Sequence, residues 1–393
     1  MKKLLIIGAS ILQLPAIQRA KELGYYVAVA DYNPNAVGIE YADEYFNAST
    51  IDIDAVVEVA KSFRPDGIMT LATDMPMRSI AKAAEVLGLP SISFETAVKA
   101  TDKAHMIRAF EANGVEHPWF YAIDDKSILE SVRARLTYPC IIKPTDNAGS
   151  RGVRLVENNS DLDSAYEYAA SSSRSGSVII EEYLRGNEVS VEIIVKDGVP
   201  HVLAVTDKIT TGAPHFVEMG HTQPSRLPEG DVEKIKDLAC RAVCAVGINT
   251  GPAHVEIMLT KDGPKMIELG ARMGGDCITT HLVPLSTGID MVEATIKLCC
   301  GETPDITPKF SKGSAIRYFN VPAGVIKNIS GVGAAEVSDG IRQISFVKGV
   351  GDTVSSIGSS TDRVGFVIGQ ADSAESAVSK VQEAISKIKI DTV

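Results

Sequence analysis

The chain of 393 residues is longer than one ordinary hydrophobic core requires, so we expect two to four domains. Its composition, 45% hydrophobic and 23% charged, is typical of a folded, soluble protein. The formal net charge of -11 argues against a nucleic acid or an anionic membrane as partner, because long-range electrostatics would repel either polyanion.

The sequence favours a reduced, cytoplasmic compartment. It contains no run of eighteen apolar residues, and its first residues reach Gly8 too soon for a signal peptide. The six cysteines form no C-x-x-C pair. Cys240 and Cys244 lie one helical turn apart, which helix packing explains better than metal binding. We therefore expect a cytoplasmic protein with no membrane partner.

Residues 1–95 alternate between predicted strands and helices. "LLIIG" and "YYVAVAD" are buried-strand runs that enclose an amphipathic helix, and a second unit follows with strand "GIMT". This order predicts a Rossmann-like parallel α/β domain. Gly8 and Asp31 resemble part of a dinucleotide fingerprint, but G-A-S-I-L-Q lacks its second and third glycines. A tight turn is favoured there; NAD binding and a small-molecule contact are the alternatives.

Residues 96–183 predict a smaller subdomain with a flap. Two short helices, a strand and a helix lead to "YPCIIKP", a glycine loop at 146–152, "GVRLV", a helix near 161–173 and "GSVIIEEYL". The loop joins two strands, whereas a P-loop joins a strand to a helix and ends in G-K-[ST], a string this chain lacks. We therefore predict a β-loop-β flap.

Residues 184–300 predict an antiparallel sheet, because the region 186–222 alternates with period two. A helix at about 231–246 and the strands "HVEIMLT" and "PKMIELG" follow, and "GARMGGD" opens a helical stretch that ends near Gly301. Residues 301–393 predict a carboxyl-terminal α+β domain, with strands near 313–320 and 363–369 and a helix at about 374–388.

Lys143 ends an apolar strand directly before the glycine loop. A buried ammonium needs an anionic partner. Gly149 and Gly152 allow the loop amides to turn toward one anion, although an ordinary β-turn also contains glycines.

The strand "VIIEEYL" ends in a run that could offer backbone groups to the edge of a purine. Four residues after Leu184, Glu188 could hydrogen-bond the hydroxyls of a ribose. A solvated strand end is the alternative interpretation.

Glu256 and Glu268 each lie inside an apolar strand, where an ionised carboxylate needs a partner. Their twelve-residue separation suits antiparallel strands joined by the turn "TKDGPK". Adjacent carboxylates repel unless a cation lies between them, and oxygen ligands favour Mg²⁺, with Mn²⁺ as a substitute. A buried salt bridge with lysine or arginine remains the alternative.

Arg272 lies four residues after Glu268 and precedes two glycines. A guanidinium beside a magnesium site can stabilise a transferring phosphoryl group or an acyl tetrahedral intermediate. A solvent-facing arginine at a helix start is the alternative.

Taken together, Lys103 in "TDKAHM", Lys143 in "IIKP", the glycine loop, "EEYLRGNE", Glu256 and "IELGARMGG" resemble ATP-grasp ligases in order and approximate spacing over nearly the whole chain. The resemblance implies an ATP-grasp fold: a preceding α/β domain at 1–95, an ATP-grasp domain at 96–300 divided at 183/184, and a lid-like domain at 301–393.

The resemblance also assigns roles by position. It implies that ATP is held by a set that comprises Lys103, Lys143, Gly149, Ser150, Arg151, Gly152, Glu181, Glu182, Tyr183, Leu184 and Glu188. It implies that Glu256 and Glu268 bind Mg²⁺, and that Arg272 and Lys143 act in catalysis.

The chain departs from the common family pattern E-x-N-x-R, because Gly270 stands where asparagine would supply a metal ligand. The branch that resembles L-amino acid ligases tolerates this change. The strings at 210–225 and 274–292 also look like that branch. Within them we expect His215, Gly274 and Gly275 near substrate. His254 shares a strand face with Glu256, and as a neutral imidazole it could deprotonate an ammonium; packing is its alternative role.

The implied reaction activates a carboxylate as an acyl phosphate and joins it to an amine, with release of ADP and phosphate. We expect amino acids as both small-molecule substrates. A purine-pathway or bicarbonate-using enzyme and a non-catalytic nucleotide-binding module are the alternatives. A homodimer is the default assembly, which no residue pattern specifies.

Overall fold

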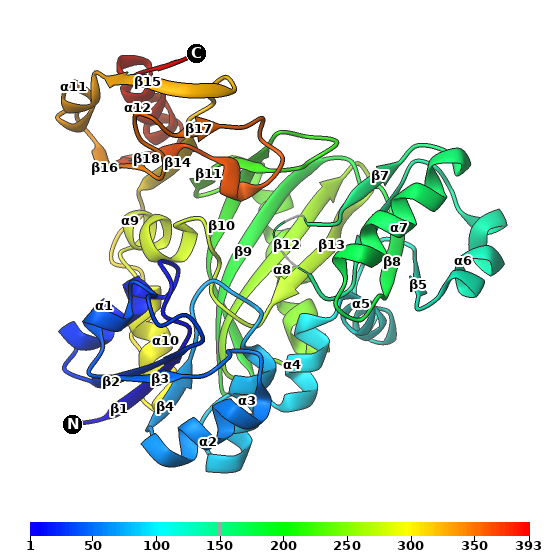
Figure 1. The fold of residues 1–393 in the computed structure, drawn as a ribbon, viewed down its shortest axis with the longest axis horizontal. Coiled ribbons are helices and arrows are strands. Elements are labelled where there is room, and N and C mark those ends of the chain that lie inside the picture. Colours follow the sequence, from blue (N-terminus) through cyan, green and yellow to red (C-terminus); the bar gives the residue numbers. More distant parts are fainter. Residues whose placement is uncertain (148, 150) are drawn as a thin grey trace.

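The computed structural model describes residues 1–147, 149 and 151–393. The chain folds into three bodies: a parallel α/β unit, a small sheet with its helices, and a large antiparallel sheet that continues into the carboxyl-terminal region (Figure 1). The predicted mixed α/β class is confirmed. No helix formed by the described residues is long and apolar enough to cross a membrane.

The amino-terminal sheet is parallel, with strand order β3-β2-β1-β4. Its elements are β1 (Lys3–Ile7), α1 (Leu14–Glu22), β2 (Tyr26–Asp31), β3 (Glu44–Asn47), α2 (Ile53–Phe63), β4 (Gly67–Met69) and α3 (Met77–Leu87). Successive side chains of β1 and β2 point to opposite faces of the sheet. One face packs on α2 and α3, and the other packs on α1 and the later helix α10 (Met291–Cys299). Helix α10 therefore completes the amino-terminal layer, although more than 200 residues separate it from β4.

The Gly8 turn after β1 is tight and internally bonded. Gly8 has φ +99°, and the Asp31 carboxylate accepts a hydrogen bond from the Ala9 amide at 2.8 Å. The second carboxylate oxygen of Asp31 accepts a hydrogen bond from the Asn33 amide at 2.9 Å. Asp31 therefore holds both the Gly8 turn and the turn that follows β2. These bonds agree with the turn interpretation of this segment.

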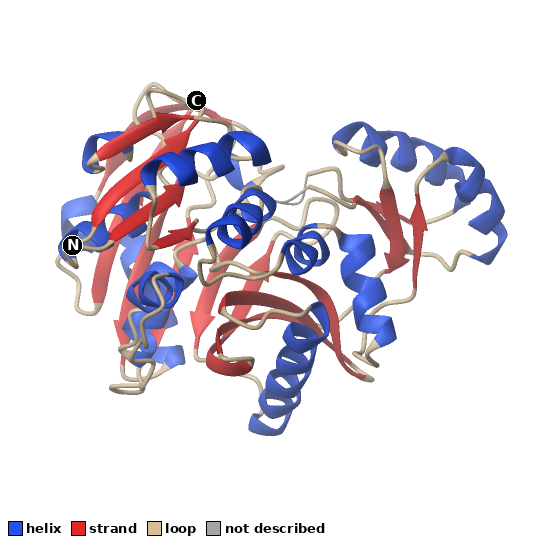
Figure 2. Cartoon of the chain, turned by 90° about the horizontal axis from the view of Figure 1, so that it is seen from below, coloured by secondary structure: helices blue, strands red, loops and turns tan. Residues whose placement is uncertain are grey.

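The small sheet has the antiparallel order β5-β8-β6-β7 and stands apart from the large sheet at one end of the molecule (Figure 2). Helices α4 (Phe94–Thr101) and α5 (Lys103–Ala112) lead to this sheet. Its elements then follow in chain order: β5 (Phe120–Ile123), α6 (Lys126–Val132), β6 (Cys140–Pro144), β7 (Arg154–Val156), α7 (Leu162–Ser172) and β8 (Val178–Glu182). The glycine loop connects β6 to β7, as the sequence predicts.

The large sheet contains eight strands in the order β13-β12-β9-β10-β11-β14-β18-β16. Its first part comprises β9 (Asn187–Lys196), β10 (Val199–Thr210), β11 (Glu218–Gln223), α8 (Glu229–Val246), β12 (Gly251–Thr260) and β13 (Gly263–Gly270). The apolar side of α8 packs against one face of this sheet and leaves the other face uncovered by that helix.

The helical stretch that the sequence predicts after β13 consists of three elements. A turn is followed by a π-helix (Ile278–Leu282) and α9 (Val283–Thr287) before α10 begins. The carboxyl-terminal region comprises β14 (Gly313–Tyr318), β15 (Gly324–Ser330), α11 (Val332–Glu336), β16 (Ile341–Phe346), β17 (Thr353–Val354), β18 (Gly365–Ala371), α12 (Ala374–Lys387) and β19 (Lys389–Thr392). Strand β14 pairs with β11, so the large sheet runs on across residue 300.

Candidate active site

A cavity of about 710 Å³ lies where the three bodies meet. The amino-terminal unit contributes 10–12 and 72–74, the small sheet contributes β6, β8 and the glycine loop, and the carboxyl-terminal region contributes 360–363. The large sheet supplies the acidic wall. Most of the sequence-predicted site residues line this one space.

Glu256 and Glu268 stand directly opposite each other on β12 and β13. A β-bulge makes this possible: Ile257 pairs with Met266, so Ile267 is the extra residue. Without it, the register set by the hairpin would place Ile267 opposite Glu256, and Glu268 would point to the other face. The bulge therefore brings both carboxylates to the cavity side, where both line the wall.

Each of these two carboxylates pairs with a lysine in this structure. Lys103 Nζ lies 3.0 Å from Glu268 Oε2 and donates to the Asn147 carbonyl at 2.8 Å. Burial alone would lower the pKa of Lys103, but the Glu268 carboxylate beside it raises that pKa above the ordinary lysine value. Burial conversely would raise the pKa of Glu268, and Lys103 holds it below the usual range.

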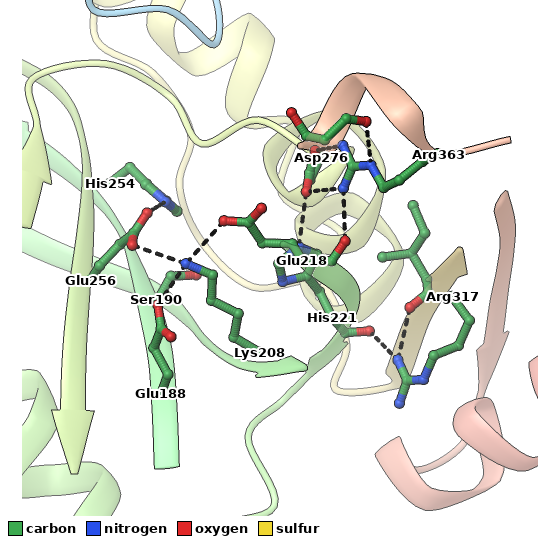
Figure 3. A network of polar contacts seen from close by, with 12 residues as sticks. Glu188, Ser190, Lys208, Glu218, His221, His254, Glu256, Asp276, Arg317 and Arg363 are labelled. Carbon is green, nitrogen blue, oxygen red and sulfur yellow. Dashed lines mark hydrogen bonds and ion pairs between the residues drawn. The ribbon is translucent and has the colours of Figure 1, made fainter. Parts of the chain in front are cut away.

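Lys208, on β10, lies among three carboxylates (Figure 3). Its Nζ is 2.6 Å from Glu188, 2.9 Å from Glu256 and 3.3 Å from Glu218. Burial would lower the pKa of Lys208, yet these carboxylates hold it well above the ordinary value.

With Glu268 and Lys103 included, four carboxylates face two ammonium groups around this wall. The excess negative charge and the hard oxygen donors suit a divalent cation. The residues present therefore fit a magnesium site, although no group of three or more His, Cys, Asp or Glu side chains among the described residues forms a preassembled metal cage.

Lys143, at the end of β6, is buried and forms an ion pair with a carboxylate. Its Nζ lies 2.5 Å from Glu181 Oε1 across the β6–β8 pair. The neighbouring carboxylate of Glu182 is bound by Lys265 at 2.7 Å. The side chains of Glu181 and Glu182 are thus both paired with lysines. The backbone groups at the end of β8 are the ones that could contact the edge of a purine.

Tyr183, Leu184 and Glu188 line the same cavity beyond that strand end. The Tyr183 ring lies 6.1 Å from the Phe216 ring, centroid to centroid. Glu188 is already engaged by Lys208. Most of the residues predicted to bind the nucleotide therefore lie around one cavity. Lys208, which the sequence did not predict as part of the site, lies among them.

Two glycines of the flap loop have left-handed backbones, Gly149 with φ +67° and Gly152 with φ +81°. A Cβ at Gly152 would lie 2.6 Å from side-chain atoms of Pro144 and Ser172, so the loop closes tightly onto the end of β6. Gly149 and Arg151 line the cavity. Ser150, also predicted for this loop, lies outside the described residues.

Arg272 is held by an acid of the amino-terminal unit. Its Nε and one terminal nitrogen each donate to Asp74 at 3.0 Å. Burial would lower the pKa of Arg272, whereas Asp74 raises it. A Cβ at Gly270 would lie 2.6 Å from Asp74 Oδ1, so the Asp74 carboxylate occupies the space that a side chain at position 270 would need.

His254 is buried and bound at both ring nitrogens: Nδ1 lies 2.8 Å from Glu192 Oε1 and Nε2 lies 3.3 Å from Glu256 Oε1. Burial would lower the pKa of His254, but the two carboxylates raise it to about 9. The ring is therefore an imidazolium near neutral pH, which does not support the neutral base that the sequence suggested. Of the other predicted substrate residues, Gly275 lines the cavity, Gly274 packs behind it, and His215 is exposed in the loop before β11 and is not among the lining residues.

A second polar network joins the carboxyl-terminal region to the cavity (Figure 3). Arg363 binds both oxygens of Asp276 at 2.7 Å, and His221 Nε2 lies 3.3 Å from Asp276 Oδ2. Asp276 and Cys277 have positive φ values of 50° and 61°, rare for residues with side chains, and the π-helix begins directly after them. Strained backbone and π-helices are concentrated at functional sites.

Sequence reasoning missed Lys208, Asp74, Glu192 and the Asp276–Arg363 pair. Of these, only Lys208 could have been found from the sequence, because it lies in a predicted antiparallel sheet beside the predicted acidic site, where an ion pair would be expected. The others depend on contacts between segments far apart in the chain.

Comparisons with known proteins agree with this geometry. Residues 136–280 match the family model of the ATP-grasp domain, and residues 317–393 match that of the L-amino acid ligase C-terminal domain 2. The alanine–anticapsin ligase of Bacillus subtilis (strain 168) is 29% identical over 329 residues, which cover 76% of this chain and 67% of that protein.

The phosphoribosylamine–glycine ligase of Methanocaldococcus jannaschii is 26% identical over 422 residues, covering 98% of this chain and 94% of that protein. In structure, the chain is similar to the L-amino acid ligase from Bacillus licheniformis, with a TM-score of 0.85 at 24% identity over 100% of this chain and 99% of the other. The predicted resemblance is confirmed.

Proposed function

Because this chain is an ATP-grasp ligase that carries the C-terminal domain of L-amino acid ligases, we propose that it joins two amino acids into a dipeptide. In this proposal one amino acid carboxylate attacks the γ-phosphorus of ATP, which gives an acyl phosphate and ADP. The amine of the second amino acid then attacks the acyl carbon and expels phosphate. Magnesium and ATP are the required cofactor and co-substrate.

The observation that carries the proposal is the alignment of Glu256 and Glu268 beside two lysines on one cavity wall. These two carboxylates would hold the divalent ion. When bound, that ion would neutralise phosphate oxygens and orient the γ-phosphoryl group. Lys103 and Lys208 neutralise only part of the charge of the four carboxylates on this wall, so a further positive charge can be accommodated there.

The remaining residues would bind and orient the substrates. Lys143 and the amides of the flap loop would hold the ATP phosphates, with the backbone near Glu182 at the adenine and Glu188 at the ribose. Arg272 would stabilise charge that develops on the phosphoryl group and on the acyl intermediate. The flap would exclude water from an acyl phosphate that water would otherwise hydrolyse.

The amino-terminal wall of the cavity is formed by Ser10, Ile11, Leu12, Ala72, Thr73 and Asp74. The Asp74 carboxylate is bound to Arg272, and Ser10 and Thr73 carry hydroxyls. The apolar side chains of Ile11 and Leu12 suit an amino acid substrate with an apolar side chain.

A phosphoribosylamine–glycine ligase is the second candidate, because one such relative aligns with nearly the whole chain. The purified protein should be incubated with ATP, Mg²⁺ and pairs of amino acids, with ADP release and product mass as the readouts. We expect ADP formation that requires both an acid and an amine, and a product with the mass of a dipeptide.

The matched control for Glu268→Gln is Glu233→Gln, which changes a surface residue of α8 that pairs with Lys236. Only the first substitution should abolish ADP release. Turnover with glycine and a phosphoribosylamine but with no amino acid pair would favour the second candidate. ATP binding with no turnover on either panel would indicate a non-catalytic module.

A further inference from the structure

A carboxylate that the proposed reaction does not use is completely buried behind the acidic wall. Glu192, on β9, has 0% exposure. Its Oε1 accepts from the Ser190 hydroxyl at 3.1 Å and lies 2.8 Å from His254 Nδ1. Its Oε2 has no hydrogen-bond partner among the described residues. A buried acid with an unsatisfied oxygen is costly, so its retention calls for a reason.

The sheet register connects this acid to the candidate metal site. Across β9 and β12, Glu192 pairs with His254 and Ser190 pairs with Glu256, so all four side chains lie on the cavity face. His254 bridges the two acids, because its other nitrogen lies 3.3 Å from Glu256 Oε1. The chain of contacts runs from the buried carboxylate through the imidazole to the acid that faces Glu268.

Gly274 encloses this chain from the other side. A Cβ at Gly274 would lie 2.6 Å from His254 Nδ1 and 2.9 Å from Glu192 Oε2. The adjacent Gly275 differs, because the nearest atom to its Cβ would be 3.9 Å away, which is ordinary contact. The first of the two glycines is therefore required by the packing of His254 and Glu192, independently of any substrate contact.

We propose that Glu192 is a positioning residue that fixes, through His254, the carboxylate of Glu256 in the orientation that binds the divalent ion. Residues behind a metal ligand orient it in this way in many proteins, and their loss weakens metal binding. This inference rests on the proposed role of Glu256 as a metal ligand. It requires His254 to have one ring orientation, which the bond to Glu192 and the closeness of Gly274 provide.

The test measures binding of Mn²⁺ and ADP to the purified full chain, by electron paramagnetic resonance of free Mn²⁺, so that no catalytic turnover is needed. Glu192→Ala should weaken Mn²⁺ binding by on the order of 10- to 100-fold. Glu192→Gln retains an oxygen acceptor for Nδ1–H and should restore most of the affinity. Gly274→Ala should weaken binding in the same direction, because its new methyl group displaces the imidazole.

Gly230→Ala is the control, because a Cβ there, in the first turn of α8, would meet no atom within 4 Å, and it should leave the Mn²⁺ affinity at the value of the unaltered protein. Near-native Mn²⁺ binding by both Glu192→Ala and Gly274→Ala would overturn the proposal. Glu256→Ala distinguishes failure of the positioning role from failure of the proposed function: normal Mn²⁺ binding by this variant would show that Glu256 is not a metal ligand.

Discussion

Replacing Gly270 with asparagine would restore the common family pattern E-x-N-x-R, yet we expect this change to damage the protein. The Cβ alone would lie 2.6 Å from Asp74 Oδ1 and 3.0 Å from Arg272 Nε. Real Cβ atoms do not approach a neighbour to 2.6 Å, so the carboxylate of Asp74 must move and its two bonds to Arg272, both 3.0 Å, must break or lengthen.

The magnitude follows from those two bonds. A hydrogen bond to a charged group contributes about 1.5 to 3 kcal/mol, so loss of one or both should lower the free energy of unfolding by about 1.5 to 6 kcal/mol. Arg272 would also leave the orientation in which we propose that it stabilises the phosphoryl group. Removal of one charge-stabilising contact typically lowers turnover by on the order of 100-fold, and we expect Gly270→Asn to reach that value.

The assay is ADP release at saturating substrates, together with urea-induced unfolding. Gly230→Ala is the control, because a Cβ there, in the first turn of α8, would meet no atom within 4 Å. A double-mutant cycle with Asp74→Ala adds a sharper test: the two changes should be less than additive, since Asp74→Ala frees the space that residue 270 needs. Native activity and stability of Gly270→Asn would refute the steric account.

Three further changes test the electrostatics of the site. Glu268→Ala should abolish ADP release without loss of the fold, which circular dichroism and an activity assay together would check; retained turnover would remove Glu268 from the mechanism. Lys208→Met should lower the free energy of unfolding by about 3 to 5 kcal/mol, because three carboxylates lose their buried cation; urea titration measures this, and an unchanged midpoint would contradict it. Burial would raise the pKa of Asp276, but Arg363 holds it far below the ordinary value. The stability from this carboxylate is therefore present above about pH 4, the ordinary aspartate pKa, and is lost as the pH falls further. Arg363→Met should flatten that acid limb in pH-dependent thermal unfolding, and an identical limb would count against the pair.

The flap and its lysine could be predicted because their signals are local. An apolar strand that ends in Lys143, followed by glycines and a second strand, specifies β6, the loop and β7 without reference to distant residues. The hairpin of β12 and β13 could likewise be predicted from its D-G turn and the apolar runs on either side of it. The order of these motifs along the chain was specific enough to indicate the family.

Which face of β13 bears Glu268 was not legible, because it depends on the bulge at Ile267. Spacing suggested that the two acids are neighbours, but a one-residue difference in register would have turned one of them away from the cavity. Only the paired strands decide that outcome.

The sequence by itself determined the secondary structure that carries the site and the types of residue that could bind nucleotide and metal, since these follow from local periodicity and motif order. The tertiary structure decided which charges meet. Asp74 reaches Arg272, Lys208 reaches three acids, and Arg363 reaches Asp276 only because separate segments converge on one cavity. Such pairings depend on distances in space, which residue spacing along a chain does not encode.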